Sequence, residues 1–178
     1  SKSKFLFMRK LRNHGIELTN KKSFPYTLNE IGFNFRLSDI NCAIGLAQLR
    51  RLENFRLKKT ELYNYFENKL KKIKNIEINK RSNFSSPLWH LLIIKLKSFN
   101  LSKKEIFMRY LFKNKIATQI HYIPIYKHKP FIKDICFSKK GAEEYFKEAV
   151  TLPFHLKLSK KDVDYIVLKI SAFFKKNK

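Results

Sequence analysis

Two polar side chains, Asn34 and Arg36, alternate with apolar neighbours in the stretch Gly-Phe-Asn-Phe-Arg-Leu-Ser-Asp that ends at Asp39. Successive side chains of an extended segment point to opposite sides, so an amide and a guanidinium would face one way and three apolar side chains the other. Such a segment offers two hydrogen-bonding groups to a ligand. The same pattern is equally compatible with a helix N-terminus that carries a buried asparagine and a surface arginine.

A second polar cluster contains Gln119, His121 and Tyr122, which lie where a predicted strand ends in a loop. Pro124 fixes the backbone of this loop and disfavours helix at the preceding residue. Binding residues collect on rigid loops of this kind. An imidazole and a phenol hydrogen-bond and stack in a way that suits a sugar or a uracil better than a metal. A half-buried histidine and tyrosine at the end of a strand explain the pattern equally well.

The rest of the chain offers no complete catalytic apparatus. Three of the four other histidines are each isolated, and no spacing of His, Cys, Asp and Glu resembles a metal site. The sequence contains no glycine-rich phosphate loop and no nucleophile elbow. The acids Glu143, Glu144, Asp162 and Asp164 fall on amphipathic helices, where exposure to solvent explains them most simply.

Helical and strand periodicities indicate how the two clusters are positioned. Ser38 is a predicted N-cap, with Asp39 in the first turn, where the helix dipole favours a negative charge. Ser102 and Glu105 form a predicted capping box, and Ser159 is predicted to cap the last helix. We expect helices over 4–13, 39–49, 51–73, 102–114, 142–150 and 160–174, strands over 75–79, 89–97 and 117–122, and an irregular polar segment over 16–30. The alternation after residue 75 indicates a small α+β layer.

The composition is that of a folded protein. The chain has 178 residues, 44% hydrophobic and 15% aromatic, enough for one domain or two small ones with a buried core. No segment resembles a signal peptide, and no apolar run is long enough to span a bilayer. Cys42 and Cys136 lie far apart, which indicates neither a disulfide framework nor a metal site and fits a reducing cytoplasm. Because Ser1 runs directly into a helical pattern, we expect an N-terminal portion to precede it.

The net charge of +25 raises an alternative function, a basic nucleic-acid-binding module with no catalysis. Only eight of the 39 basic residues are arginine, and the lysines are scattered over every segment. A phosphate-binding stripe would be clustered, and arginine would usually read the bases. We therefore expect weak, nonspecific binding of polyanions at low salt and no specific nucleic-acid partner.

Several stretches of the chain resemble the DegT/DnrJ/EryC1/StrS family of sugar aminotransferases. They are residues 12–15 (Arg-Asn-His-Gly), 32–39 running into 43–49 (Ala-Ile-Gly-Leu-Ala-Gln-Leu), 121–126 (His-Tyr-Ile-Pro-Ile-Tyr) and 152–153 (Leu-Pro). The family uses pyridoxal phosphate (PLP) on an aspartate-aminotransferase-like fold, fold type I, as a homodimer with shared active sites. It moves an amino group from glutamate to a keto group on a nucleotide-linked sugar. The resemblance implies an α/β chain that forms the C-terminal portion of this fold.

By this resemblance, residues 1–50 are the end of the large PLP-binding domain, 51–74 the connecting helix and 75–178 the small C-terminal α+β domain. The family motif that holds the Schiff-base lysine, with its Gly-Glu-Gly-Gly run, does not occur in this sequence. We therefore assign no catalytic residue to the chain and expect it to be inactive by itself. A degenerate remnant that keeps only the fold is a further alternative.

The resemblance also implies roles for individual positions. Asn34 matches the residue that reaches the PLP phosphate of the other subunit, and a short neutral donor caps a phosphate without forming a salt bridge. Arg36 would support that loop or bind the anionic nucleotide sugar. The residues that would line the nucleotide-sugar site are Gln119, Ile120, His121, Tyr122 and Tyr126. The pair Tyr126-Lys127 resembles the branch that makes a UDP-linked amino sugar for pseudaminic acid, which implies a UDP-linked 4-keto-6-deoxy sugar as amino acceptor.

Overall fold

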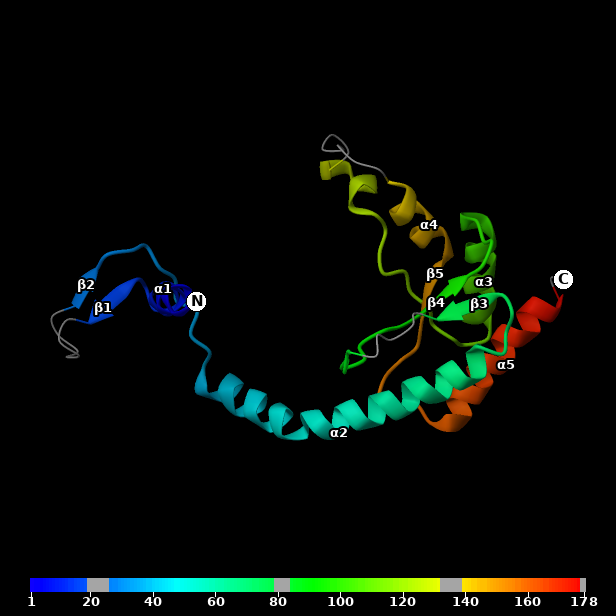
Figure 1. Ribbon diagram of the computed structural model, residues 1–178, viewed down its shortest axis with the longest axis horizontal. Helices are drawn as coiled ribbons and strands as arrows, with labels where there is room; N and C mark the ends of the chain where they lie inside the picture. The colour runs from blue at the N-terminus through cyan, green and yellow to red at the C-terminus, as the bar shows by residue number, and fades with distance from the viewer. Residues whose placement is uncertain (19–25, 79–83, 132–138, 177–178) are drawn as a thin grey trace. The chain divides into compact units, whose positions relative to one another are not determined.

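The computed structural model describes residues 1–18, 26–78, 84–131 and 139–176 (Figure 1). The chain divides into two compact units, Ser1–Leu52 and Glu53–Lys178. Cys136 lies outside the described residues, as does part of the polar segment predicted over 16–30. In the described part of the chain, no helix combines the length and the hydropathy needed to cross a membrane.

The first unit contains short elements and the start of a long helix. These are α1 (Lys2–Arg12), the antiparallel strands β1 (Ile16–Leu18) and β2 (Tyr26–Leu28), and the beginning of α2 (Asp39–Leu70). The two strands correct the prediction of an irregular segment. Each strand has three residues, too few for a period-two pattern to be recognised in the sequence. Ser1 caps α1 by accepting a hydrogen bond from the Lys4 amide at 3.5 Å.

Helix α2 runs without interruption for 32 residues. Its predicted cap is confirmed, because the Ser38 hydroxyl accepts a hydrogen bond from the Asn41 amide at 3.3 Å and Asp39 lies in the first turn. The prediction of two helices, over 39–49 and 51–73, is wrong. No proline separates them, so the backbone continues as one helix. Its buried side chains lie near the C-terminal end and are Tyr63, Phe66 and Leu70.

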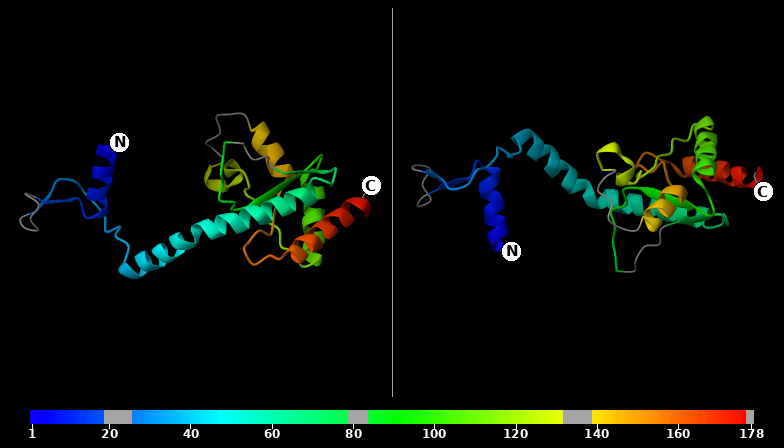
Figure 2. Two further views of the ribbon diagram at one scale, coloured as in Figure 1. Left: turned by 60° about the horizontal axis from the view of Figure 1, so that its bottom comes forward. Right: turned by 90° about the horizontal axis from the view of Figure 1, so that it is seen from above.

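The second unit is built on a three-stranded antiparallel sheet in the order β3–β4–β5 (Figures 1 and 2). Its elements are β3 (Ile76–Ile78), β4 (Leu92–Leu96), α3 (Leu101–Lys113), α4 (Lys140–Glu148), β5 (Ala149–Leu152) and α5 (Lys160–Lys176). In the central strand, Leu92, Ile94 and Leu96 are buried and alternate with half-buried residues. This arrangement confirms the α+β layer predicted after residue 75.

The hydrophobic core, as far as the described residues show it, belongs to the second unit. It joins the C-terminal part of α2 to β4, β5, α3 and α5. Its fully buried side chains are Phe66, Leu70, Leu92, Ile94, Leu96, Phe107, Leu111, Val150, Val163 and Ile170. Figure 2 shows the C-terminal part of α2 beside α5. There Lys69 forms an ion pair with Asp164 at 2.7 Å, and Tyr65 donates a hydrogen bond to the same carboxylate at 3.0 Å.

The N-terminus of α3 differs from the prediction. Asn100 caps this helix, and its side chain accepts a hydrogen bond from the Lys103 amide at 2.9 Å. The predicted capping box of Ser102 and Glu105 is therefore wrong. Asparagine caps helices as well as serine does, and Asn100 stands two residues earlier in the chain.

The elements after residue 115 follow the prediction in part. The Ser159 cap of α5 is confirmed, because its hydroxyl accepts a hydrogen bond from the Asp162 amide at 3.2 Å. The helix expected over 142–150 ends at Glu148, and the residues after it pair with β4 as strand β5. The strand expected over 117–122 is reduced to one bridge between Gln119 and Thr151. Pairing with a distant strand overrides the local helical pattern here.

Candidate functional site

Asn34 and Arg36 lie on a segment that is fixed to the end of α1 by its backbone. Three backbone hydrogen bonds of 2.7–3.0 Å join Phe33 to Leu11, His14 to Phe33, and Phe35 to Arg12. Asn34 also forms an isolated antiparallel bridge with Asn13. The rings of Phe33 and Phe35 stack on one side of the segment, with centroids 4.8 Å apart. The predicted alternation of side chains is therefore present, on a backbone held in place by α1.

Two glycines allow this close approach. Gly15 has a φ of +75°, and a Cβ atom there would lie 1.8 Å from the carbonyl oxygen of Glu30. A Cβ atom on Gly32 would lie 2.1 Å from the amide nitrogen of Gly15. Any side chain at either position would push the segment away from α1.

The two polar side chains differ in what they contact. Arg36 donates a hydrogen bond to the Asn13 Oδ1 atom at 2.6 Å, which ties the segment to the end of α1. Asn34 is exposed, and its amide forms no hydrogen bond with another described residue. A neutral amide on a fixed backbone can donate to a phosphate oxygen. The Asn34 amide is therefore able to donate to such a ligand, and the Arg36 contact with Asn13 supports the loop.

A hollow of about 800 Å³ lies beside this segment and has basic walls. Arg9, Arg12 and Arg36 line it, together with Lys10, which forms an ion pair with Glu17 at 2.7 Å. Hydrogen bonding from Lys10 lowers the pKa of the Glu17 carboxyl. Since the three arginines outnumber the acids, the hollow favours an anionic ligand.

In the second unit, strand β5 holds the start of the predicted substrate loop. Gln119 and Thr151 exchange backbone hydrogen bonds at 3.1 and 2.9 Å, and the Nδ1 atom of His121 lies 2.8 Å from the Thr151 hydroxyl. The ring of Tyr122 meets the His121 ring edge to face, with centroids 4.8 Å apart. Ile120 is half-buried, whereas Tyr122 is 73% exposed. The phenol of Tyr122 is thus open to a ligand.

Tyr126, at the other end of this loop, contacts an acid on α4. Its hydroxyl donates a hydrogen bond to the Oε1 atom of Glu143 at 3.1 Å, and the Nζ atom of Lys127 lies 2.9 Å from the same oxygen. Burial, and then the contact with Glu143, raises the pKa of Tyr126. The hydrogen bond from Lys127 is the main cause that lowers the pKa of Glu143. At neutral pH the phenol is therefore protonated and the carboxylate is charged.

Thr151 and Glu143 are two contact residues that the sequence did not reveal. Thr151 stands 30 positions from His121, and no local pattern marks it. Glu143 lies on an amphipathic helix, where exposure to solvent was the simplest expectation. Its charge opposite Lys127 is a signal, but a chain with 39 basic residues offers many such pairs.

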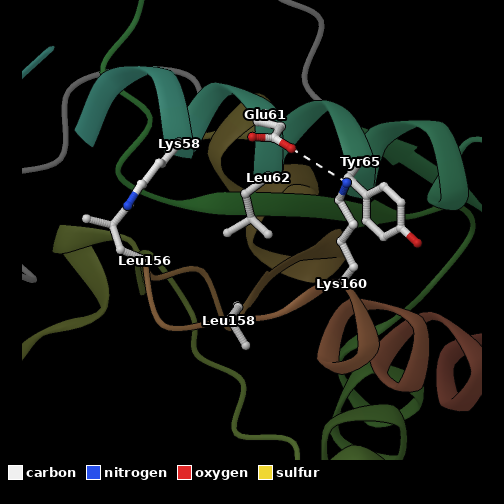
Figure 3. A pocket seen from close by; sticks show the side chains of 7 residues that line it. All are labelled: Lys58, Glu61, Leu62, Tyr65, Leu156, Leu158 and Lys160. Carbon is white, nitrogen blue, oxygen red and sulfur yellow. Dashed lines mark ion pairs between the residues drawn. The ribbon is translucent and has the colours of Figure 1, made fainter. Parts of the chain in front are cut away.

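A separate hollow of about 250 Å³ lies between α2 and the residues that lead into α5 (Figure 3). Its lining consists of Lys58, Glu61, Leu62, Tyr65, Leu156, Leu158 and Lys160. Glu61 and Lys160 form an ion pair of 3.6 Å across it, and the exposure of both side chains makes this pair weak. None of the predicted site residues lines this hollow. Within the described ranges, no cluster of three or more His, Cys, Asp or Glu side chains could hold a metal ion.

Comparison with known proteins links these features to one family. Residues 5–171 match the DegT/DnrJ/EryC1/StrS aminotransferase family. The UDP-4-amino-4,6-dideoxy-N-acetyl-beta-L-altrosamine transaminase of Campylobacter jejuni subsp. jejuni serotype O:2 is 29% identical over 158 residues, which cover 88% of this chain and 41% of that protein. The structure of Helicobacter pylori PseC, an aminotransferase involved in the biosynthesis of pseudoaminic acid, superimposes with a TM-score of 0.87 at 25% identity. The superposed residues make up 99% of this chain and 47% of PseC.

The fold is also shared with a protein of lower sequence identity. Spr1654 of Streptococcus pneumoniae, solved in its PMP form, superimposes with a TM-score of 0.85 at 22% identity, covering 98% of this chain and 46% of that one. The chain thus spans less than half the length of the relatives that it matches. These superpositions confirm the predicted fold, a portion of the fold type I of PLP-dependent enzymes. By the match over residues 5–171, the chain belongs to the DegT/DnrJ/EryC1/StrS aminotransferase family, whose members use pyridoxal phosphate.

Proposed function

We propose that the chain is the substrate-recognition part of a PLP-dependent sugar-nucleotide aminotransferase. The reaction transfers an amino group from glutamate to a UDP-linked 4-keto-6-deoxy sugar, in the biosynthesis of pseudaminic acid or another surface glycan. The observation that carries the proposal is the exposed Asn34 amide on its fixed backbone, inside a family match that spans residues 5–171. The names of the Campylobacter jejuni transaminase and of PseC support the choice of sugar.

In this proposal, Asn34 donates a hydrogen bond to the phosphate of PLP bound in the other subunit of a homodimer. Arg36 keeps the Asn34 backbone in place through Asn13. When bound, PLP supplies the electron sink that lets an amino group move between glutamate and a keto sugar. The lysine that moves the proton in the family has no counterpart in this sequence, so the 178 residues alone transfer no amino group.

The nucleotide sugar binds, in the same proposal, at the loop that begins at Gln119. The exposed ring of Tyr122 offers a stacking face, and the imidazole of His121, oriented by Thr151, offers its Nε2 atom. Gln119 is exposed, and its side-chain amide, which has no hydrogen-bond partner among the described residues, can meet a polar group of the sugar or the uracil, while Ile120 adds apolar contact. Free Cys42 is exposed, which suits the reducing cytoplasm that we propose as the location.

The reading frame upstream of Ser1 gives a first test of this proposal. A lysine followed by Gly-Glu-Gly-Gly directly before Ser1 is the expected result. A reading frame without such a lysine would favour the alternatives, a degenerate remnant or a binding module.

Asn34→Ala tests the assigned residue in the protein made from the complete reading frame. We expect PLP retention after gel filtration, followed by the absorbance of the bound cofactor, to weaken about tenfold, since a hydrogen bond to a charged group is lost. Asn41→Ala is the matched control, because Asn41 is also an exposed asparagine, in the first turn of α2. Equal retention of PLP in the Asn34→Ala and Asn41→Ala proteins would contradict the role of Asn34.

A further inference from the structure

Glu143, on helix α4, binds two consecutive residues of the predicted substrate loop through one carboxylate. The Tyr126 hydroxyl donates to its Oε1 atom at 3.1 Å, and the Lys127 Nζ atom lies 2.9 Å from the same oxygen. The Nζ atom of Lys139 lies over the Tyr126 ring, 5.3 Å from its centroid. The Glu143 side chain is 28% exposed, so the pair is partly shielded from solvent. Shielding of this degree makes the contact stronger than a free surface ion pair.

Helix α4 is itself fixed to α3. Lys104, on α3, is only 3% exposed, and its ammonium donates a hydrogen bond to the Phe146 carbonyl. That carbonyl lies in the last turn of α4, where carbonyls lack a partner within the helix. The Lys104 Nζ atom also lies 4.4 Å from the centroid of the Phe146 ring. Glu143 therefore stands on a helix that is anchored to the sheet unit rather than on a free surface.

The loop between residues 121 and 127 is thus held at both ends. At its start, the buried Thr151 hydroxyl contacts the imidazole of His121 at 2.8 Å. At its end, Glu143 contacts Tyr126 and Lys127. Because the Tyr126 hydroxyl already donates to Glu143, its remaining hydrogen-bonding capacity toward a ligand is that of an acceptor.

We propose that Glu143 is a positioning residue for the nucleotide-sugar site: it holds Tyr126 and Lys127 so that His121 and Tyr122 keep their binding positions. The proposal rests on the proposed function, since the loop is taken to bind the nucleotide sugar. It changes the role of Tyr126, which becomes a link between the loop and α4. Glu143 touches neither substrate nor cofactor in this account and acts through the loop.

Hydrogen exchange on the 178-residue chain tests the structural half of the proposal. The amides of Lys127 and His128 donate to the carbonyls of Pro124 and Ile125 at 2.9 and 3.0 Å, so they report whether the loop keeps its conformation. In Glu143→Gln we expect exchange at these amides to be about three- to tenfold faster. The matched control is Glu144→Gln, on the same helix. Glu144 is exposed, and its side chain forms no hydrogen bond or ion pair with a described residue.

Two further measurements distinguish a local change in the loop from a general loss of stability. The Thr151 amide, which donates to Gln119 across the sheet edge, should exchange at the wild-type rate in Glu143→Gln. Tyr126→Phe should accelerate the same loop amides. In the double variant, the acceleration of exchange should be smaller than the product of the two single accelerations, because both substitutions weaken the same contact. Wild-type exchange at Lys127 and His128 in Glu143→Gln would overturn the proposal.

Steady-state kinetics of the protein from the complete reading frame test the functional half. We expect Glu143→Gln to raise KM for the UDP-linked keto sugar about tenfold, with KM for glutamate unchanged and kcat within about twofold of wild type. Glu144→Gln should leave all three constants unchanged. Equal effects on both KM values, or a loss confined to kcat, would overturn the positioning role. If the wild-type protein shows no turnover, the proposed function fails, while the exchange rates still decide whether Glu143 holds the loop.

Discussion

At the scale of single residues, the site depends on side chains that fix other side chains. Thr151 is 6% exposed, and its hydroxyl meets the Nδ1 atom of His121. The backbone of the same residue pairs with Gln119. One residue of β5 therefore sets both the path of the chain at Gln119 and the orientation of the imidazole two positions later.

Thr151→Val should show how much this contact contributes. The variant keeps the shape of the side chain but leaves the half-buried His121 nitrogen without a partner, which costs about 1–2 kcal/mol of unfolding free energy. Urea unfolding of the two proteins measures this loss. Thr118→Val is the control, because Thr118 is half-buried and its hydroxyl has no described partner. A loss in Thr118→Val as large as that in Thr151→Val would argue against a specific contact with His121.

The sequence marks the candidate site residues more clearly than the residues that support them. Asn34 and Arg36 were recognisable because a local alternation and a family motif mark them. Glu143 and Thr151 were not, because each acts on a residue that is distant in the chain, and one sequence contains no record of such pairs. The exposure of Asn34 could not be predicted either, since the same pattern fits a buried asparagine.

At the scale of elements, the two phenylalanines of α3 separate core from surface within one helix. Phe107 is 0% exposed and packs against Phe99, Phe173 and Phe174, whereas Phe112 is 74% exposed. Phe107→Ala should lower the unfolding free energy by about 3–5 kcal/mol, because it leaves a cavity. Phe112→Ala should change it by less than about 0.5 kcal/mol. Chemical unfolding of both variants measures the difference, and similar losses would show that α3 packs in another orientation.

The contact between α2 and α5 makes stability depend on pH. The hydrogen bond from Lys69, followed by that from Tyr65, lowers the pKa of Asp164 below its value in an unfolded chain, about 3.9. The stabilisation is therefore complete above this value and is lost as the pH falls through the lower pKa of the folded state. Unfolding of wild type and Asp164→Asn between pH 2 and 6 measures it.

Asp164→Asn should be less stable than wild type at pH 6, and the difference in unfolding free energy should shrink as the pH falls toward 2. The control is Glu77→Gln, because Glu77 is exposed on β3 and its side chain has no described partner. A constant difference between wild type and Asp164→Asn over this range would rule out the ion pair as its cause.

Helix caps and strand patterns were predicted to different degrees. Ser38 and Ser159 were identified correctly because a capping side chain acts within three residues. Ser102 was wrong because Asn100 competes for the same role two residues away. The short strands β1 and β2 were missed, and the strand over 117–122 was reduced to one bridge, because pairing between distant segments decides both.

At the scale of the whole molecule, the described core lies in one unit. Among the described residues, all buried apolar side chains fall between positions 63 and 173, and α1 has none. Many large apolar side chains of residues 1–52 are exposed, among them Phe5, Met8, Phe35, Ile40 and Leu49. Residues 1–52 therefore present apolar side chains that the described residues of the same unit do not cover.

Limited trypsin digestion of the 178-residue chain should reflect this difference. We expect residues 1–50 to be cut first and a fragment that starts after Arg50 or Arg51 to persist. Local unfolding requires little free energy where little apolar surface is buried. Mass spectrometry of the fragments over time measures the order. Survival of residues 1–50 for as long as the rest of the chain would contradict the expectation.

The charge of the molecule does not by itself define a function. Described acids often pair with lysine or arginine on the surface, as Glu53 does with Arg56 and Glu105 with Arg109. The remaining positive charge favours polyanions at low salt, as expected for binding without sequence preference. The family match, in contrast, supports the proposal of a nucleotide sugar as the anionic ligand.

The most direct test follows nitrogen from donor to acceptor. The protein from the complete reading frame is incubated with PLP, glutamate labelled with heavy nitrogen, and a UDP-linked 4-keto-6-deoxy sugar, and the nucleotide sugar is analysed by mass spectrometry. We expect an amino sugar that carries the label, formed more slowly by Asn34→Ala at limiting PLP. An unlabelled, unchanged keto sugar with the wild-type protein would contradict it.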